Sequence, residues 1–338
     1  MKRILIIFAI VAVWGAFGAE DRESVDRKIG VKRIFRPERF VRGDENVRGI
    51  QEIDRAAWIW APNDERYGDA AMMVGVRKHS DYQSRFFRFR CEFPAKSDVP
   101  LRIDVSADER FILCLDGQEI ARGPHRGHPD HWFYESYEIA LPEGNHTMDA
   151  VVWQVGPHAP LAQLSFRGGF VMKAEEPYDT LLTTGKAEWK VARLNGTVLT
   201  GKGENDAWGV GSESRSVGTS FASEEPFADA WMGAVTVRAP LDDDDCGVVA
   251  PGWLLFPSAL PDQLHERQVP GAIRAVRNDS PLDHYVATDA DSPWVSDFNS
   301  LLAKETSLTI PAHTKFRVLW DLDNYYCAYP ELRIKGGS

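Results

Sequence analysis

The chain has 338 residues and a formal net charge of −11 at pH 7, from 50 acidic and 39 basic residues. This excess of negative charge repels nucleic acid and anionic lipid surfaces, so we expect neither as a partner. The length exceeds that of one ordinary domain and predicts two, and 11 Trp and 17 Phe residues supply large rings for cores and for stacking on sugars.

The first 18 residues have the features of a secretory signal peptide. A basic pair follows Met1, and the apolar run Ile4–Trp14 is too short to cross a bilayer. Ala16 and Gly18 are small residues at the positions expected before cleavage after Gly18, and cleavage after Ala19 is the alternative. We therefore expect an exported protein, periplasmic or extracellular, with no membrane attachment once the signal is cleaved.

The stretch Gln83–Val155 has the clearest strand pattern in the chain. Apolar residues occupy every second position in Phe87–Phe93, with charged residues between them, which is typical of a strand with one buried face. Asp116-Gly117 separates two further apolar runs and predicts a tight hairpin, because both central residues of such a turn have positive φ. We therefore predict four or more antiparallel strands and an all-β fold, a β-sandwich or jelly roll.

Four short motifs lie in the same stretch. They are SADERF at 106–111, LDG at 115–117, ARGP at 121–124 and HWFYESYEI at 131–139. Together they resemble the N-terminal, non-catalytic β-sandwich region of bacterial α-L-rhamnosidase-like glycoside hydrolases, and segments at 227–231, 252–257 and 329–337 resemble later parts of that region. In this family an (α/α)6 barrel follows, and the barrel carries the two carboxylates that hydrolyse the glycosidic bond with inversion.

The resemblance implies two tandem sandwiches of the galactose-binding-like jelly-roll type. We divide the chain into a signal peptide at 1–18, a charged linker or arm at 19–54, a first sandwich at 55–195, a loop-rich linker at 196–225 and a second sandwich, complete or incomplete, at 226–338. The sequence has no run of long amphipathic helices that would supply a barrel. We therefore expect no catalytic residue in this chain and no hydrolysis of rhamnosides by it alone.

These expectations lead to two hypotheses about function. The first is an accessory part of an exported α-L-rhamnosidase-like glycoside hydrolase that binds carbohydrate or positions a domain. It would be a gene fragment or one piece of a split gene, with a separately encoded catalytic domain as partner. The second is a free-standing exported carbohydrate-binding or scaffold protein, because fold alone does not separate these roles. In both, the expected ligand is a rhamnose-containing glycan, whose neutral sugars the negative charge does not repel.

The loop after the ARGP motif supplies the candidate sugar-binding residues. Arg126 and His131 offer hydrogen bonds to hydroxyl groups, and Trp132 offers an apolar ring that can stack on the C–H face of a sugar. Trp132 is equally suited to a place in the core, so both alternatives stay open for this residue.

Two clusters raise the question of a metal. His125, His128 and His131 form a His-x2-His-x2-His pattern, but the prolines and the glycine of this loop exclude the helix that would align the rings. The aspartate run Asp242–Asp245 lacks the spaced ligands of a calcium loop, so a solvated loop is favoured there and calcium is left open. We expect no cofactor and assign no metal ligand.

Asp108 and Glu109 are the most tempting pair of carboxylates. Adjacent strand residues point to opposite faces, so the two cannot converge on one glycosidic bond, and we expect Asp108 to order a turn and pair with an arginine. Cys91 and Cys114 both fall in predicted strands, where the sequence allows either a cross-strand disulfide or two buried thiols.

Overall fold

A computed structural model describes residues 29–42, 44–62, 64, 84–96, 99–155, 162–195, 198–200, 215–217, 225–242, 253–262, 270–278, 292–303, 307–312, 314 and 316–326. The predicted signal peptide and Asp243–Asp245 lie outside the described residues. The chain divides into two compact units, one of them Asp26–Asp262 and the other including Gln263–Ser338.

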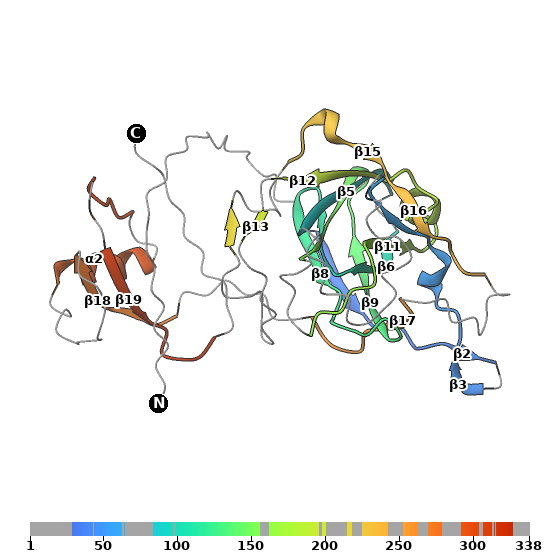
Figure 1. Ribbon diagram of the computed structural model, residues 1–338, viewed down its shortest axis with the longest axis horizontal. Coiled ribbons are helices and arrows are strands. Elements are labelled where there is room, and N and C mark those ends of the chain that lie inside the picture. The colour runs from blue at the N-terminus through green and yellow to red at the C-terminus, as the bar shows by residue number, and fades with distance from the viewer. Residues whose placement is uncertain are drawn as a thin grey trace. The chain divides into compact units, whose positions relative to one another are not determined.

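The larger unit is a sandwich of two β-sheets (Figure 1). In the first sheet the strand order is β1-β9-β6-β11-β4-β16, and β17 also pairs with β9. These strands are β1 (Gly30–Ile34), β4 (Trp58–Trp60), β6 (Leu101–Asp108), β9 (Trp132–Ala140), β11 (Gly169–Ala174), β16 (Val235–Arg238) and β17 (Leu255–Pro257). β17 runs parallel to β9, whereas the other pairs of this sheet are antiparallel.

The second sheet has the order β15-β12-β5-β10-β7-β8 and is antiparallel. Its strands are β5 (Arg85–Ala95), β7 (Arg110–Leu115), β8 (Gln118–Gly123), β10 (Gly144–Gln154), β12 (Lys190–Leu194) and β15 (Met232–Gly233). The prediction of an all-β fold is confirmed. The described residues contain no helical barrel, and their α-helices are α1 (Asp179–Leu182) and α2 (Pro293–Leu302).

Smaller elements surround the two sheets. They are the hairpins β2 (Phe40–Val41) with β3 (Asp44–Arg48) and β13 (Val198–Thr200) with β14 (Arg215–Val217), and 3-10 turns at Glu52–Arg55 and Ala228–Ala230. The β13–β14 hairpin lies within the segment 196–225 that the sequence predicts to be loop.

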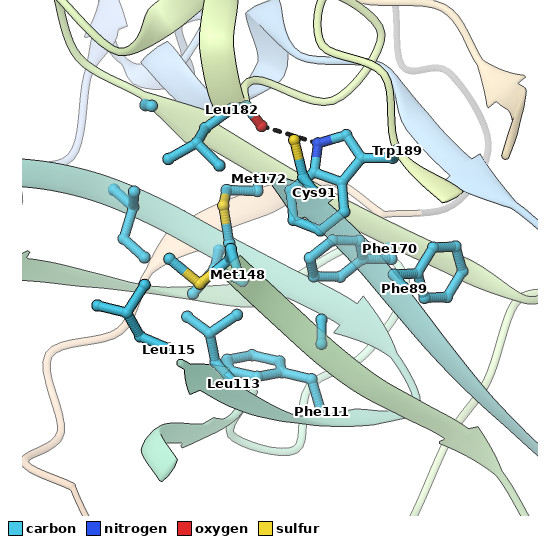
Figure 2. Close-up of a cluster of buried hydrophobic side chains, with 14 of the residues drawn as sticks. Phe89, Cys91, Phe111, Leu113, Leu115, Met148, Phe170, Met172, Leu182 and Trp189 are labelled. Atoms are coloured by element: carbon cyan, nitrogen blue, oxygen red, sulfur yellow. Dashed lines mark hydrogen bonds between the residues drawn. The ribbon is translucent and has the colours of Figure 1, made fainter. Parts of the chain in front are cut away.

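The inner faces of the two sheets enclose the main core (Figure 2). Phe87, Phe89, Cys91 and Phe93 all lie in this core, so the alternation predicted for this strand is confirmed. Figure 2 shows Cys91 and Phe170 beside Trp189, whose indole N–H donates to the carbonyl of Leu182 at 2.9 Å. The bond satisfies the polar atom of a buried ring, so Trp189 can contribute its full apolar area.

The tight turn at Asp116-Gly117 joins β7 to β8 as predicted. The φ angles of the two residues are +50° and +80°, and Leu115 pairs with Gln118 across the turn. The Asp116 carboxylate also accepts a hydrogen bond from the backbone N–H of Thr147 at 2.9 Å. The hairpin is thereby attached to β10.

The outer faces of the sheets are more buried than the alternation predicts. Arg88, on the outer face of β5, is 5% exposed and donates to Asp149 at 3.2 Å. Asp104 and Ser106, on the outer face of β6, are also buried. A period of two identifies two faces, but it does not show that other chain segments cover the polar one.

The described part of the predicted arm is bound to the sandwich. β1 forms an edge strand along β9. Arg36 makes an ion pair with Asp104 at 3.0 Å, and Nε of Arg48 donates to the carbonyl of Leu255 at 2.6 Å. The arm is therefore attached both by the backbone pairing of β1 and by arginine side chains.

Three short strands, β15, β16 and β17, complete the same sandwich. β15 pairs with β12, β16 pairs with β4, and β17 pairs with β9. The sequence predicts a second sandwich from 226, whereas the division of the chain lies after Asp262. Strands of two to four residues are too short to show an alternating pattern, so their long-range pairing leaves no local signal.

The other unit is described from residue 270 to residue 326, with gaps. β18 (Ala272–Asn278) pairs with β19 (Phe316–Asp321), and α2 packs on them through Phe298. The Asn299 side chain accepts from the backbone N–H of Ile273 at 2.9 Å and donates to its carbonyl at 3.1 Å. A second sandwich stays a prediction here. Within the described part of the chain, no helix is long and apolar enough to span a bilayer.

Cys91 and Cys114 are free thiols, and both are buried. Cys91 lies in the core between the sheets, whereas Cys114 lies in a separate cluster with Val151. The two side chains thus occupy opposite faces of one sheet, which excludes the disulfide alternative. Burial raises the pKa of both thiols to about 11, so neither is a reactive thiolate at neutral pH.

Candidate functional site: the loop between β8 and β9

The loop Pro124–His131 leaves one sheet after β8 and enters the other at β9 (Figure 1). Beneath it lie β9 and β17, in which Phe256 is paired with Phe133, and Ser258 continues the pairing through a backbone hydrogen bond. Side chains two residues apart on a strand share a face. Two supports for the loop therefore lie next to each other. The first is formed by Phe133 of β9 and Phe256 of β17, and the second by Glu135 of β9 and by Ser258, which follows β17.

His131 contacts the first support. Its ring stacks on Phe256 with centroids 3.8 Å apart and planes at 11°, and it meets Phe133 nearly edge-on at 5.1 Å. The guanidinium carbon of Arg48 lies 5.4 Å from the centroid of the Phe256 ring. His131 itself is exposed, so the site presents a supported imidazole ring at the surface.

His125 contacts the second support. Its Nδ1 lies 2.9 Å from Oε1 of Glu135 and 2.9 Å from Oγ of Ser258, and its backbone N–H donates to the same Oε1 at 2.9 Å. The side chain of Glu135 is 1% exposed and that of His125 is 20% exposed. Among the described residues, Oε2 of Glu135 has no hydrogen-bond donor.

Each of the two imidazoles contacts one of these supports. Residues two apart along a strand are roughly 7 Å from each other, so the supports of His125 and His131 are separated by about the span of one monosaccharide. Arg126 is exposed and lies in the same loop. The arrangement offers hydrogen-bonding groups and a flat ring to a ligand of sugar size.

Ser258, His125 and Glu135 are residue types of a nucleophilic triad, but their geometry is different. In a triad, one ring nitrogen contacts the nucleophile and the other contacts the carboxylate. Here both partners contact Nδ1, and Ser258 is buried. The cluster therefore orients His125 and does not activate Ser258.

The three predicted sugar-binding residues have different positions. Arg126 and His131 are exposed in the loop. Trp132 is 1% exposed, and its indole N–H donates to the carbonyl of Ala107 at 3.2 Å. It packs in a second apolar cluster that includes Trp253, so the structure shows the core alternative for this residue. The reason is the alternation of β9, which directs Trp132 to the face opposite Phe133.

The three histidines of the loop do not converge. His125 contacts Glu135, His131 stacks on Phe256, and Nδ1 of His128 accepts a hydrogen bond from the backbone of Asp130 at 3.2 Å. No group of three metal-ligating side chains is present in the part of the chain that the structure describes.

Asp108 orders a turn, as the sequence predicts. It accepts hydrogen bonds from Oγ of Ser165 at 2.7 Å, from the backbone N–H groups of Phe166 and Arg167 at 2.6 and 3.0 Å, and from the indole N–H of Trp253 at 2.9 Å. The turn is thus held mainly through backbone groups, and the expected ion pair of Asp108 with an arginine side chain is not found among the described residues. Burial raises the pKa of Asp108 to about 6, although these bonds favour the ionised form.

Glu109 does not follow Asp108 into a strand. It lies between β6 and β7, and its Oε2 accepts from the backbone N–H of Val155 at 3.0 Å. The alternation assumed for this pair therefore ends at Asp108, and both carboxylates bind backbone groups of neighbouring segments.

Sequence reasoning missed Glu135, Phe256 and Ser258. Glu135 occurs in the HWFYESYEI motif, where it resembles an ordinary polar strand residue. Phe256 and Ser258 come from a segment more than a hundred residues later, and the sequence contains no local sign that it pairs with β9.

No protein-family model matches the chain, and no curated protein matches it either. Three solved structures are similar to it in part. A GH78 family rhamnosidase of Bacillus sp. GL1 is 24% identical with a TM-score of 0.46, over 67% of this chain and 22% of that one. An α-L-rhamnosidase from Dictyoglumus thermophilum is 14% identical with a TM-score of 0.33, over 56% and 22%. A Pleurotus ostreatus lectin is 13% identical with a TM-score of 0.27, over 57% and 44%.

The chain spans 22% of the length of each of the two rhamnosidases. With identities below 25% and TM-scores below 0.5, these likenesses assign no activity or ligand to the chain.

Proposed function

We propose that this chain binds carbohydrate through the β8–β9 loop, as a non-catalytic accessory part of an exported α-L-rhamnosidase-like glycoside hydrolase. The sequence motifs that resemble this family support the proposal. SADERF spans the end of β6 and the start of β7, ARGP leads into the loop, and HWFYESYEI begins at His131 and covers most of β9. ARGP and HWFYESYEI thus lie on the loop and on the strand β9 that build the site, whereas SADERF lies elsewhere in the same sandwich.

The observation that carries the proposal is the mounting of exposed loop residues on a rigid base. His131 is supported by stacking on Phe256, and Arg126, exposed in the same loop, supplies a charged donor. A pre-formed base reduces the entropy lost when a weakly binding sugar is captured. Hydroxyl groups accept from Arg126, and the C–H face of a sugar packs on a flat ring such as His131.

A free-standing exported carbohydrate-binding protein is the second candidate. The observation that favours it is the closure of two sheets over one core within Asp26–Asp262, together with a loop site built from residues of the same unit. Both candidates use the same surface, and they differ in whether a separate catalytic domain binds the chain.

Isothermal titration calorimetry of the full chain tests carbohydrate binding. The ligands are L-rhamnose, a rhamnose-containing polysaccharide and N-acetylgalactosamine, and we expect heat with the rhamnose ligands. Arg126→Ala and His131→Ala should each weaken binding about tenfold, the loss of one hydrogen bond or ring contact. His128→Ala is the matched control, because His128 is exposed in the same loop and contacts Asp130 instead of the supports. Absence of heat with all three ligands would refute the proposal.

The accessory role has its own test. The purified full chain should release no chromophore from an aryl α-L-rhamnoside, because the described residues place no pair of carboxylates across the loop site. Release at a rate that scales with the concentration of the chain, and that survives repeated purification, would show a catalytic protein instead.

A further inference from the structure

We propose that buried Glu135 holds His125 in the tautomer protonated at Nδ1, so that Nε2 accepts a hydrogen bond from a hydroxyl group of the ligand. Glu135 is then a positioning residue, and His125 is a further ligand-binding residue beside Arg126 and His131. The ligand role rests on the proposed function, whereas the positioning by Glu135 does not.

The geometry at Nδ1 fixes the proton. Oε1 of Glu135 lies 2.9 Å from Nδ1 and accepts from the His125 backbone N–H at the same distance. An unprotonated Nδ1 would direct its lone pair at a carboxylate oxygen in a site removed from water. A protonated Nδ1 forms a charge-assisted hydrogen bond there instead. Oγ of Ser258, at 2.9 Å, is a second acceptor for the same proton.

The surroundings of Glu135 hold its side chain in contact with the His125 ring. Its side chain is 1% exposed, and a Cβ added to Gly123 would lie 2.5 Å from its Oε2. Oε2 has no donor among the described residues, so the hydrogen bonds of this buried carboxylate are concentrated on His125. A buried carboxylate with one satisfied oxygen is stabilised by that single contact, and the contact sets both the tautomer and the orientation of the ring.

The proton at Nδ1 leaves Nε2 as an acceptor. Nε2 has no hydrogen-bond partner among the described residues, and the side chain of His125 is 20% exposed. Arg126 in the same loop donates hydrogen bonds but cannot accept them. An acceptor beside a donor matches the hydroxyl groups of a neutral sugar, each of which can donate one hydrogen bond and accept others.

Nitrogen-15 NMR of the histidine rings tests the positioning without any ligand. In the full chain at neutral pH, the His125 ring, identified by the signal lost in His125→Gln, should be protonated at Nδ1 and unprotonated at Nε2. Ser258→Ala should keep this tautomer, because Glu135 still accepts the proton. Glu135→Gln should produce a mixture of both tautomers. Protonation of the wild-type ring at Nε2, or an equal mixture of tautomers, would overturn the proposal whether or not the chain binds sugar.

Calorimetry with L-rhamnose and the polysaccharide tests the ligand role. His125→Ala should weaken binding about tenfold and Glu135→Gln roughly threefold, with His128→Ala as the control. Wild-type affinity in His125→Ala would overturn the ligand role while the proposed function stands. Failure of the wild-type chain to bind either ligand, with the Nδ1 tautomer present, would refute the proposed function and the ligand role but leave the positioning by Glu135 intact. Titration with Zn²⁺ tests metal binding as the alternative role of Nε2. We expect the wild type and His125→Ala to give the same result with Zn²⁺. Heat of binding that is seen in the wild type and lost in His125→Ala would show that Nε2 binds a metal instead.

Discussion

Asp108 and Glu135 are buried carboxylates in two regions of one sandwich, and their surroundings differ. Both oxygens of Asp108 accept hydrogen bonds, from a serine, an indole and two backbone groups. In Glu135 one oxygen accepts two bonds from a single residue, His125, and the other has no donor among the described residues. The first region is a turn held in place, and the second is a loop that carries a ring with a free nitrogen.

This difference in hydrogen-bond partners distinguishes a buried carboxylate that only stabilises the fold from one that also orients a ligand-binding residue. The hydrogen bonds of Asp108 all come from groups of the neighbouring turn and from Trp253, so this network stabilises local structure. A network that ends on a partly exposed imidazole transmits orientation from the core to the surface. Each carboxylate can therefore be tested by asking whether its loss changes stability alone or binding as well.

The largest effect is expected for Asp108→Ala. The substitution removes the acceptor of the buried Trp253 indole and of two backbone N–H groups, whereas the exposed Ser165 hydroxyl can bind water instead. At about 1 kcal/mol or more for each of the three N–H groups, the free energy of unfolding should fall by about 3–4 kcal/mol. Chemical denaturation followed by tryptophan fluorescence measures this. Glu135→Gln should lower it by less than half as much, and an equal loss would remove the distinction between the two regions.

The strands around these carboxylates were predictable where the signal is local. Alternation in β5 and the Asp116-Gly117 turn are properties of neighbouring residues, and the structure confirms both. The pairing of Gly30 with Ala140 and of Phe256 with Phe133 joins distant segments. Backbone hydrogen bonds form with almost any residue type, so the sequence does not indicate which distant segments pair. The addition of β1, β15, β16 and β17 to the sandwich was therefore missed.

The site was predicted in part for the same reason. Arg126 and His131 follow from loop composition, and the structure places both at the surface. The burial of Trp132 could have been inferred, because alternation along β9 places it opposite Phe133. The role of Glu135 could not, since Gly123 from the other sheet lies against its carboxylate and the Ser258 that also contacts His125 comes from a distant segment.

The pH dependence of stability provides the next largest effect. The pKa of Asp108 is raised from 3.8 to about 6 in the folded chain, so the folded state binds the proton more tightly than the unfolded state. Its contribution to stability is fully present below pH 3.8, falls as the pH rises towards 6, and is constant above that. The expected fall is about 3 kcal/mol.

The measurement is the difference in unfolding free energy between the wild type and Asp108→Asn at a series of pH values. Asparagine does not titrate, so the subtraction removes the other ionisable groups that both proteins share. The difference should decline between pH 4 and 6. A difference that rises over this interval would mean that hydrogen bonds, rather than burial, dominate at Asp108.

The smallest expected change in stability is that of Gly123→Ala, a substitution next to Glu135. A Cβ at Gly123 would lie 2.5 Å from Oε2 of Glu135 and 2.8 Å from the Phe111 ring, so Gly123→Ala must displace the carboxylate, the phenyl ring or both. We expect a loss of about 1–2 kcal/mol in unfolding free energy. Gly233→Ala is the matched control, because nothing lies within 4 Å of its added Cβ and the substitution should change stability by less than about 0.5 kcal/mol.

Gly123→Ala also separates displacement of Glu135 from displacement of Phe111. Movement of the carboxylate should change the protonation pattern of the His125 ring in nitrogen-15 NMR, because the ring depends on Glu135 for its tautomer. Movement of the phenyl ring alone should lower stability and leave that pattern as it is in the wild type. Since Gly123 lies at the end of β8 and His125 two residues later, a changed pattern would show that the loop takes its orientation from the carboxylate beneath it and not from the strand that precedes it.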